Sequence, residues 1–448
     1  MSPNRSRFLA GVTPAADSMR VAHILRKYNP AEWGGTETAV ERLFEGLHPA
    51  VTPIIYCPRL QKNGAVNGAR DPLAERGYEI KRFRACVPVW GISKTERAQM
   101  ISVGGNILSF DLIAALWREP VSIIHSHALG RLGGIALTVA KRRKLPFVVT
   151  IHGGYLDLPE TLRRQMDDPS YGGVEWGKAF GAVFNSRRVV PDADAILTCN
   201  EREAALLREK FPGKRIRVQP HGVPVTIFEH DHRAAARTAF PQLAGKQLIL
   251  LVGRVDPVKN QRWVVERVPA ILMKHPNAVV VLAGACTDAE YGRELEISIR
   301  ELGLQEKVLM PGGFPPGDPR LIGLMQQAAV VVLPSISETF GLVILEAWAA
   351  GAPVISSRTS GASALMQDGE NGWLFNLENP QEFHEALDQV LGNQKSAAAA
   401  AAKGRELARC TYDTAVLAGH VRALYEELLR EPRYREGVLK PRVDACAT

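Results

Sequence analysis

Two glutamates stand eight positions apart in the segment SISETFGLVILEA, residues 335–347. Glu338 falls in a loop after an apolar strand, whereas Glu346 falls inside an otherwise apolar helix over 342–350. A carboxylate on such a helix is costly unless a partner donates hydrogen bonds to it. Because a carboxylate accepts two vicinal hydroxyl groups well, the pattern favours a polyhydroxylated ligand over a merely solvated side chain.

The turn GRVDPVKN, residues 253–260, holds two cations after another predicted strand. Ligands of open α/β sheets bind beyond the carboxyl ends of the strands. Arg254 through its planar fork and Lys259 as a point charge could therefore clamp a diphosphate. A solvated loop with capping roles is the alternative interpretation.

Glycines and a histidine follow predicted strands of the first half. Gly34 and Gly35 precede a helix, where the backbone can approach a ligand and free N–H groups can meet an anion, although a plain turn is also compatible. His152 ends the strand PFVVTIHG and precedes two more glycines. We expect its imidazole to point into the same space as the glycine loop.

His125 and His127 end another predicted strand and share one face of the sheet. That arrangement permits a metal, but no third ligand is evident nearby in the sequence. We therefore expect structural histidines, or an acceptor contact from His127, and no metal site.

The elements that must position these residues are short apolar runs alternating with helical patterns. Runs of Val, Ile and Leu without alternation are typical of parallel strands buried on both faces, so we predict two doubly wound α/β sheets. The predicted strands cover residues 19–25, 122–127, 146–153, 195–200, 247–253, 278–284, 307–313, 329–334 and 352–357.

Composition sets the remaining bounds. The 448 residues are 46% hydrophobic, which excludes disordered, collagen-like and small disulfide-rich proteins. No apolar run reaches the roughly 18 residues of a membrane span, and six widely spaced cysteines suit a reducing cytosol. Residues 1–222 hold 32 Lys and Arg against 21 Asp and Glu, whereas residues 223–448 hold 23 against 26. We expect a cytoplasmic protein whose first half faces something anionic.

With these motifs in order over nearly all of residues 20–430, the chain resembles a retaining GT-B glycosyltransferase of the group 1, or family 4, type. That family includes bacterial mannosyl- and glucosyltransferases and sucrose synthases. The most specific likeness is the pair Glu338 and Glu346 with the intervening FGL, supported by GRVDPVKN and by DGENGWLF at 368–375. One departure is His221–Pro224, where the family usually has Asn-Gly-Val-Asp.

The resemblance implies a donor domain and an acceptor domain that face each other across a cleft. The expected division is a flexible leader over 1–18, an acceptor-side domain over 19–222, a linker over 223–245, a donor domain over 246–410, a helix returning to the first domain over 411–432, and a tail over 433–448.

The resemblance also implies a role for each motif residue. Arg254 and Lys259 would bind the donor diphosphate, Glu346 the ribose and Glu338 the transferred sugar, with His152 near the reacting face. The implied catalytic residues are His152, Glu338, Arg254 and Lys259. The implied donor-binding residues are Gly34, Gly35, Gly253, Arg254, Lys259, Glu338, Phe340, Gly341, Leu342 and Glu346. Acceptor contacts are expected from His127, Arg131 and Tyr155.

The implied reaction moves a hexose from a UDP- or GDP-sugar to an acceptor hydroxyl with retention, on one face of the sugar, without a metal or other cofactor. Cations and helix N–H groups would stabilise the departing diphosphate. The acceptor would be a sugar, a polyol or a lipid-linked hydroxyl, and the basic first half would suit an anionic one.

Other classes remain open at this point. A metal-dependent glycosyltransferase would use Asp192-Ala193-Asp194, but that string precedes a strand, at the wrong end for a ligand. A sugar-nucleotide epimerase would bind the same donors without an acceptor, and an idle carbohydrate-binding protein would do no chemistry. A nicotinamide dehydrogenase lacks its G-x-G-x-x-G after the first strand.

The densest basic cluster of the first half has two interpretations. The cluster Lys141–Lys144 could meet an anionic membrane surface, or it could simply place cations at a helix C-terminus. Nucleic acid is not expected, because no aromatic and basic platform accompanies the dispersed charges.

Overall fold

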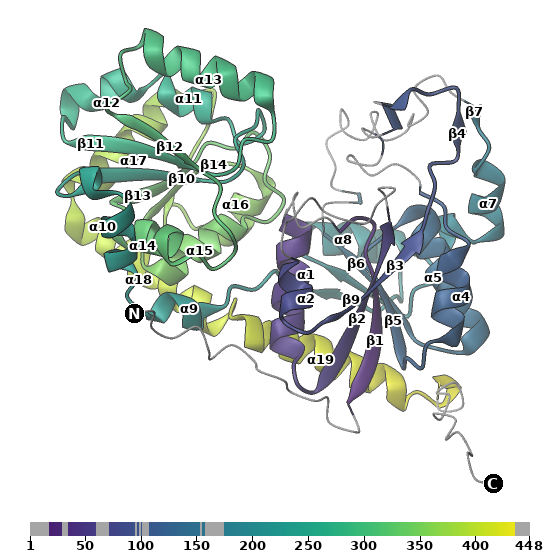
Figure 1. The fold of residues 1–448 in the computed structure, drawn as a ribbon. Helices are drawn as coiled ribbons and strands as arrows, with labels where there is room; N and C mark the ends of the chain where they lie inside the picture. Colours follow the sequence, from purple (N-terminus) through teal and green to yellow (C-terminus); the bar gives the residue numbers. More distant parts are fainter. Residues whose placement is uncertain are drawn as a thin grey trace, which may run out of the picture. The chain divides into compact units, whose positions relative to one another are not determined.

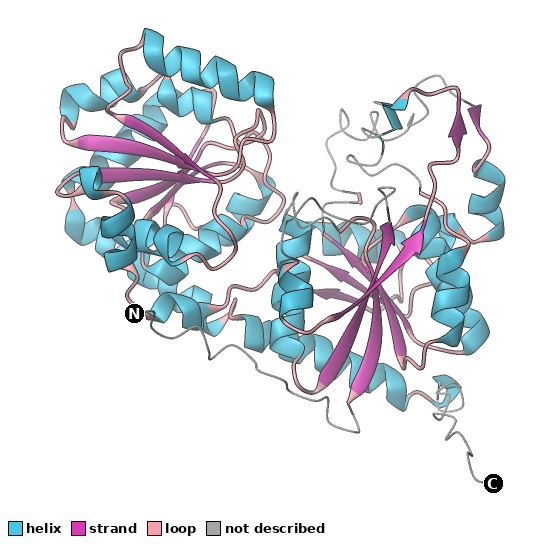
Figure 2. Cartoon of the chain, in the orientation of Figure 1, coloured by secondary structure: helices cyan, strands magenta, loops and turns pink. Residues whose placement is uncertain are grey.

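The computed structural model describes residues 18–28, 35–59, 71–94, 96–97, 100, 107–152, 155–156 and 174–434 (Figure 1). The chain divides into two compact units. The first comprises Met1–Pro220 and Ala418–Thr448, and the second comprises His221–Leu417. Figure 2 shows that each unit consists of a central sheet with helices on both faces.

The first unit contains a seven-stranded parallel sheet in the order β3-β2-β1-β5-β6-β8-β9. Its strands are β1 Met19–Ile24, β2 Val51–Arg59, β3 Glu79–Arg84, β5 Ile123–Ser126, β6 Phe147–Ile151, β8 Ala195–Thr198 and β9 Ile216–Val218. β4 Val89–Trp90 and β7 Val174–Glu175 form a small antiparallel pair. The helices are α1 Gly35–Leu47, α2 Pro72–Glu75, α4 Asp111–Arg118, α5 Gly130–Arg143, α7 Lys178–Val183 and α8 Glu201–Lys210.

The second unit contains a six-stranded parallel sheet in the order β12-β11-β10-β13-β14-β15. Its strands are β10 Gln247–Val252, β11 Ala278–Ala283, β12 Val308–Gly312, β13 Val330–Leu333, β14 Val354–Ser357 and β15 Trp373–Phe375. The helices are α9 Val225–Glu229, α10 Arg233–Ala239, α11 Gln261–Val265, α12 Val268–Lys274, α13 Ala289–Glu301, α14 Pro319–Gln327, α15 Leu342–Ala350, α16 Ser360–Leu365, α17 Pro380–Gly392 and α18 Gln394–Cys410.

Helices cover both faces of each sheet, so the central strands are apolar throughout. Every residue of β5, β6, β8, β11 and β13 is buried. Burial on both faces explains why these strands read as continuous runs rather than as alternating patterns. Each of the nine predicted strands is present, to within one or two residues at each end.

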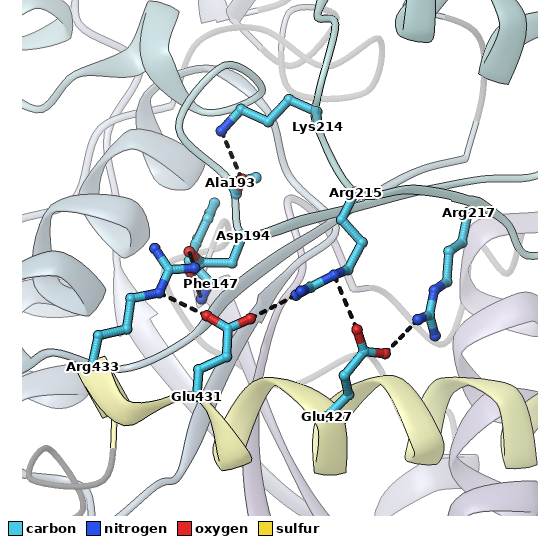
Figure 3. A network of polar contacts seen from close by, with 9 residues as sticks. All are labelled: Phe147, Ala193, Asp194, Lys214, Arg215, Arg217, Glu427, Glu431 and Arg433. Carbon is cyan, nitrogen blue, oxygen red and sulfur yellow. Dashed lines mark hydrogen bonds and ion pairs between the residues drawn. The ribbon is translucent and has the colours of Figure 1, made fainter.

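The long helix α19, Thr414–Arg430, packs onto the first sheet along one stripe. Val421, Leu424 and Tyr425 are at most 1% exposed and lie in a cluster with Val21 and Ile123. The helix also carries acidic side chains that pair with the β9 region. Figure 3 shows Glu427 contacting both Arg215 and Arg217, and Arg215 reaching on to Glu431 at 2.9 Å. Apolar burial and a flanking row of ion pairs thus fix this helix to the first unit.

The segment 223–245, which we expected to be a linker, is largely helical. It forms α9, α10 and a short 3₁₀ helix, and α10 packs against α14 in the second unit. His232 N–H donates to Gln326 Oε1 at 2.8 Å, and Gln326 Nε2 donates to the carbonyl of His230 at 2.7 Å. The segment looked polar because its apolar contacts come from single residues such as Val225, Phe228 and Ala236 rather than from a continuous run.

Residues 1–17 of the expected leader and 435–448 of the expected tail lie outside the described residues. In the described ranges, no helix combines the length and the apolar character that crossing a membrane requires.

Candidate active site

The loop after β10 holds both predicted cations. Gly253 follows the strand with φ of 147°, a left-handed value that favours glycine. Asp256 is buried, accepts a hydrogen bond from the Lys259 backbone N–H at 3.0 Å and pairs with Arg254 at 3.1 Å. The Arg254 side chain is 52% exposed and that of Lys259 is 20% exposed. The buried Asp256 therefore fixes the loop, while the side chains of Arg254 and Lys259 both keep access to solvent.

The loop after β13 is joined to this cationic loop. Glu338 forms an ion pair with Lys259, and its own side chain is 19% exposed. The backbones are tied as well, because Ile336 N–H donates to the Val258 carbonyl at 2.8 Å and Asn260 Nδ2 donates to the Pro334 carbonyl at 3.2 Å. Two loops from neighbouring strands thus form one polar surface at the carboxyl edge of the second sheet.

Helix α15 begins directly after this surface (Figure 1). Gly341 precedes it in a left-handed conformation with φ of 93°, and Leu342 is its first residue. Phe340 is buried, with its ring edge-on to His221 at a centroid distance of 4.9 Å. Glu346 lies one turn into the helix and is half-buried, whereas Ile344, Leu345, Ala347 and Trp348 are fully buried. The structure therefore places Glu346 on the accessible side of a helix whose other residues from Ile344 onward are buried.

In the first unit, the predicted histidines come together with one that the sequence analysis did not single out. His23 lies in β1, in register with His125 of the neighbouring β5. His127 Nε2 lies 2.9 Å from His23 Nδ1, and His127 Nδ1 lies 2.7 Å from His152 Nε2. Burial lowers the pKa of His152 to about 4 and holds the pKa values of His23 and His125 well below their usual range. The imidazoles of His23, His125 and His152 are therefore neutral near pH 7.

Two family models match consecutive parts of this chain. The one described as glycosyl transferase 4-like domain matches residues 34–223, and the one described as glycosyl transferases group 1 matches residues 234–407. The chain belongs to the group 1 glycosyltransferases. This finding confirms the family and the enzyme class that the motifs indicated.

Relatives with curated names agree with this assignment. The D-inositol 3-phosphate glycosyltransferase of Acidothermus cellulolyticus is 30% identical over 292 residues, which span 62% of this chain and 62% of that relative. The protein of the same name from Corynebacterium jeikeium is 28% identical over 395 residues, which span 83% of this chain and 88% of the relative.

Solved structures show the fold. Anabaena HepE in complex with UDP and glucose superposes with a TM-score of 0.66 at 17% identity, covering 91% of this chain and 100% of that one. Sucrose-phosphate synthase from Thermosynechococcus elongatus superposes with a TM-score of 0.67 at 22% identity, covering 92% and 99%. This glycosyltransferase thus has the predicted GT-B architecture of two Rossmann-like parallel-sheet domains.

The expected acceptor residues of the glycosyltransferase differ in their surroundings. Arg131 is 4% exposed, forms an ion pair with the buried Glu175 and donates to the Gly177 carbonyl at 3.0 Å. Its guanidinium therefore holds the β7 region in place, and the acceptor contact expected of it conflicts with this burial. Tyr155 is half-buried, and its backbone N–H donates to the buried Glu203 at 3.1 Å.

The histidine cluster also changes the sequence interpretation of metal binding. The ligand nitrogens of His23, His125 and His127 lie within 4.8 Å of one another, so these three could hold a metal ion. The third ligand that the sequence did not reveal is His23, because strand pairing brings it beside His125 from a hundred residues away. Both ring nitrogens of His125 are already engaged, by the Tyr425 hydroxyl at 2.5 Å and the Thr150 hydroxyl at 2.6 Å.

The remaining predicted residues belong to the first unit. Gly35 is exposed and begins α1, whereas Gly34 lies outside the described residues. Lys141 of the basic cluster pairs with Asp192, and Arg143 is buried and donates to the Leu116 carbonyl. The cluster lies in the last turn of α5, as its helix-capping interpretation requires.

Several supporting residues escaped the sequence analysis. Gly361 N–H donates to the Glu338 carbonyl at 2.8 Å, and a Cβ at Gly361 would lie only 2.5 Å from the Phe340 nitrogen. Asp256 and Gln261 hold the cationic loop, the latter by donating to the Arg254 carbonyl at 2.7 Å. Of these residues, only Asp256 could have been found from the sequence, because it lies inside GRVDPVKN between the two cations.

Proposed function

We propose that this glycosyltransferase moves a hexose from a UDP- or GDP-sugar to an acceptor hydroxyl, with retention of the anomeric configuration and without a metal ion. The observation that carries the proposal is the polar surface built from Arg254, Lys259 and Glu338 at the carboxyl edge of the second sheet. Ligands of open α/β sheets bind at this edge. The structure of HepE in complex with UDP and glucose supports a nucleotide-sugar donor.

In the proposed reaction, the bond between the anomeric carbon and the phosphate oxygen breaks, and the acceptor oxygen attacks from the same face. The acceptor proton passes to a departing phosphate oxygen, so no protein nucleophile is needed. Lys259 and Arg254 stabilise the negative charge that gathers on the diphosphate. Because both cations are anchored before the donor arrives, little reorganisation is required in the transition state.

The carboxylates take the hydroxyl groups of the donor. Glu338 contacts the transferred sugar, and its pairing with Lys259 sets the distance between the sugar and the diphosphate subsites. Glu346 binds the ribose from the accessible side of α15, and the backbone from Phe340 to Leu342 contacts phosphate at the start of that helix. The half-burial of Glu346 among core residues makes its hydrogen bonds to hydroxyls stronger than they would be in water.

The acceptor is a sugar, a polyol or a lipid-linked molecule with an anionic group. The excess of basic residues over 1–222 supports an anionic acceptor, and relatives named D-inositol 3-phosphate glycosyltransferase give a phosphorylated polyol as an example. A peripheral contact with an anionic membrane would bring a lipid-linked acceptor to the site. The β4–β7 pair supports this contact, because Trp90 and Val174 are each 66% exposed.

The deciding experiment is a thermal-shift screen with UDP-, GDP- and ADP-sugars, followed by NMR of the product formed from the best donor. We expect one UDP- or GDP-sugar to raise the melting temperature and to give a product with the donor's anomeric configuration. An inverted product would contradict retention, and an epimerised nucleotide sugar without transfer would indicate an epimerase. Binding without any turnover or hydrolysis would indicate a carbohydrate-binding protein.

Two further measurements test the finer parts of the proposal. Turnover should be unchanged by EDTA, and loss of activity that a divalent metal restores would contradict the metal-free mechanism. Co-sedimentation with liposomes should increase with acidic lipid and should weaken in Trp90→Ala. Equal sedimentation with neutral and acidic liposomes would remove the membrane contact.

A further inference from the structure

The strand order of the first sheet reverses between β1 and β5. In the order β3-β2-β1-β5-β6-β8-β9, the chain passes from β1 to β2 and β3 on one side and then to the remaining strands on the other side. Ligands of open α/β sheets bind outside the carboxyl ends of the strands at such a switch point. A ligand of the first unit is therefore expected beside the residues that directly follow β1.

Arg26 lies at this position, two residues after the end of β1. Its side chain is half-buried, and its Nη1 is buried without a hydrogen-bond partner. Among the residues that the structure describes, the guanidinium makes no hydrogen bond and no ion pair. Burial lowers the pKa of Arg26, and the charge of Glu37 in the first turn of α1 acts against this effect. Because an arginine stays protonated in proteins, a charge is held here without a partner.

An unpartnered cation in such a place is costly, because a charge removed from water needs a partner to compensate for its lost hydration. The two arginines near the end of β3 have such partners. Arg82 pairs with Asp71 at 3.4 Å, and Arg84 holds Asp111 through two bonds of 2.7 and 3.2 Å. Arg26 differs from both, and an anionic ligand would supply what the described residues do not.

The backbone on either side of Arg26 is fixed. Leu25 N–H donates to the Tyr56 carbonyl at 2.9 Å, which continues the pairing of β1 with β2. Tyr28 is 3% exposed, and its carbonyl accepts a hydrogen bond from Arg82 Nη1 at 3.2 Å. The guanidinium thus extends from an ordered segment, so little further ordering of the backbone is required when a ligand binds.

The free donors of Arg26 indicate the chemistry of its ligand. A guanidinium has five N–H donors in a planar fork and no acceptor, which matches the oxygens of a phosphate group. The donor diphosphate is the less suitable candidate, because Arg254 and Lys259 already provide two cations for it in the second unit. Residues 1–222 hold 32 Lys and Arg against 21 Asp and Glu, so the excess of cations lies on the acceptor side.

We propose that Arg26 binds a phosphate group of the acceptor and thereby selects a phosphorylated acceptor. This inference rests on the proposed function, because it concerns the molecule that receives the sugar. Arg26 is a specificity residue and takes no part in breaking the bond of the donor. The anionic character of the acceptor is thereby assigned to one side chain at the switch point rather than to the general basic surface of the first half.

The direct test titrates the full-length protein with inorganic phosphate while the nucleoside diphosphate of the best donor saturates the donor site. Chloride keeps the ionic strength constant, so that general screening does not change. We expect phosphate to raise the wild-type melting temperature and Arg26→Gln to weaken phosphate binding about tenfold or more. Arg84→Gln removes an exposed cation from the same edge of the sheet and should bind phosphate as the wild type does. Equal phosphate binding by Arg26→Gln and wild type, or none by the wild type, would overturn the proposal.

The stability of the same variant separates a binding role from a structural one. Because Arg26 has no partner among the described residues, Arg26→Gln should not lower the melting temperature when phosphate is absent. Arg26→Lys keeps the charge without the planar fork and should retain part of the phosphate binding. A fall of several degrees in both variants without phosphate would show that Arg26 holds the fold together, and would overturn the proposal.

The affinity for the nucleoside diphosphate assigns the phosphate to the acceptor rather than to the donor. We expect Arg26→Gln to bind the nucleoside diphosphate as the wild type does, whereas Lys259→Met should bind it more weakly. A tenfold loss of this affinity in Arg26→Gln would place Arg26 on the donor and overturn the proposal.

Inhibition of sugar transfer by inorganic phosphate distinguishes an acceptor subsite from a regulatory site. Phosphate should raise the KM for the acceptor without lowering kcat, and this effect should be lost in Arg26→Gln. A lower kcat with unchanged KM would indicate a regulatory site and overturn the proposal. If phosphate binding depends on Arg26 but the wild type transfers no sugar, the proposed function fails while Arg26 remains a phosphate-binding residue.

Discussion

Lys259 and Glu338 form an ion pair across two loops that follow different strands of the second sheet. Both side chains are about one-fifth exposed, so the pair lies at the surface of the site rather than within the core. A surface ion pair of this kind contributes little to stability, on the order of 1 kcal/mol or less. We infer that the pair is maintained for what it does to a ligand, because each partner becomes available when a diphosphate or a sugar hydroxyl replaces the other.

Removing the cation should therefore affect catalysis more than folding. We expect Lys259→Met to lower kcat/KM for the donor by about 10²- to 10³-fold, the usual loss when one preorganised donor to a developing anion is removed. Lys259→Arg should recover part of the loss, since the charge is kept but its geometry differs. Steady-state kinetics measure the effect, with the exposed Lys274→Met as control. Activity within a few-fold of wild type in Lys259→Met would contradict the assignment.

Glu338 can be separated from Lys259 by a double-mutant cycle. We expect Glu338→Ala to reduce turnover more than donor binding, because its contacts to the sugar matter most at the reacting centre. If Glu338 only held Lys259 in place, the double variant would be no worse than Lys259→Met alone. If Glu338 also binds sugar, as proposed, the two losses should partly add. If the double variant lost no more activity than Lys259→Met alone, Glu338 would be a positioning residue only.

Glu346 should act on affinity rather than on rate. Charge-assisted hydrogen bonds are worth about 1.5–3 kcal/mol each, so Glu346→Ala should raise the donor dissociation constant roughly 10- to 100-fold. Turnover at saturating donor should change little, because the ribose is distant from the bond that breaks. Isothermal titration with the donor or its nucleoside diphosphate measures this, with the exposed Glu378→Ala as control. A fall in kcat with unchanged affinity would contradict the ribose assignment.

Much of the fold, and the polar surface formed by Arg254, Lys259 and Glu338, was predictable from the sequence, because local patterns encode both. Continuous apolar runs predicted the buried strands, and the residues that follow those strands predicted Arg254, Lys259 and Glu338. The strands that were missed have weaker patterns. β2 contains Pro53 and Pro58, β3 is an edge strand with four charged residues among its six, and β9 and β15 have three residues each.

What could not be predicted depends on contacts between distant segments. His23 has no local signal, and its role appears only when β1 pairs with β5. Arg131 was expected to contact the acceptor, and nothing near it in sequence indicates that it is buried in an ion pair with Glu175, 44 residues away. The sequence gives the type of residue at the end of each strand, but tertiary contacts decide whether its charge meets a ligand or another side chain.

The attachment of α19 offers a comparison between burial and surface charge. Tyr425 is 0% exposed, and its hydroxyl lies 2.5 Å from His125 Nδ1. Tyr425→Phe leaves that nitrogen unsatisfied and should lower the free energy of unfolding by about 1–3 kcal/mol. Arg217→Ala removes an ion pair whose side chains are about two-fifths exposed and should cost about 1 kcal/mol or less. Urea denaturation of both variants measures the difference, and a larger loss in Arg217→Ala would contradict the ranking.

The buried histidines should make stability depend on pH between about 4 and 6.5. The pKa of His152 is lowered to about 4, and those of His23 and His125 lie well below their usual value near 6.5. In this window the unfolded chain therefore binds more protons than the folded protein, so the free energy of unfolding falls as the pH is lowered. Above about pH 6.5 these groups are neutral in both states and contribute no slope to the dependence of stability on pH.

We expect the melting temperature to be nearly level from pH 8 to 7 and to fall from pH 6.5 to 5, where most paired carboxylates are still ionised. His152→Asn should flatten the fall by removing one proton-binding difference, whereas the exposed His230→Asn should leave it unchanged. A wild-type melting temperature that stays level down to pH 5 would show that these imidazoles are not held neutral by burial.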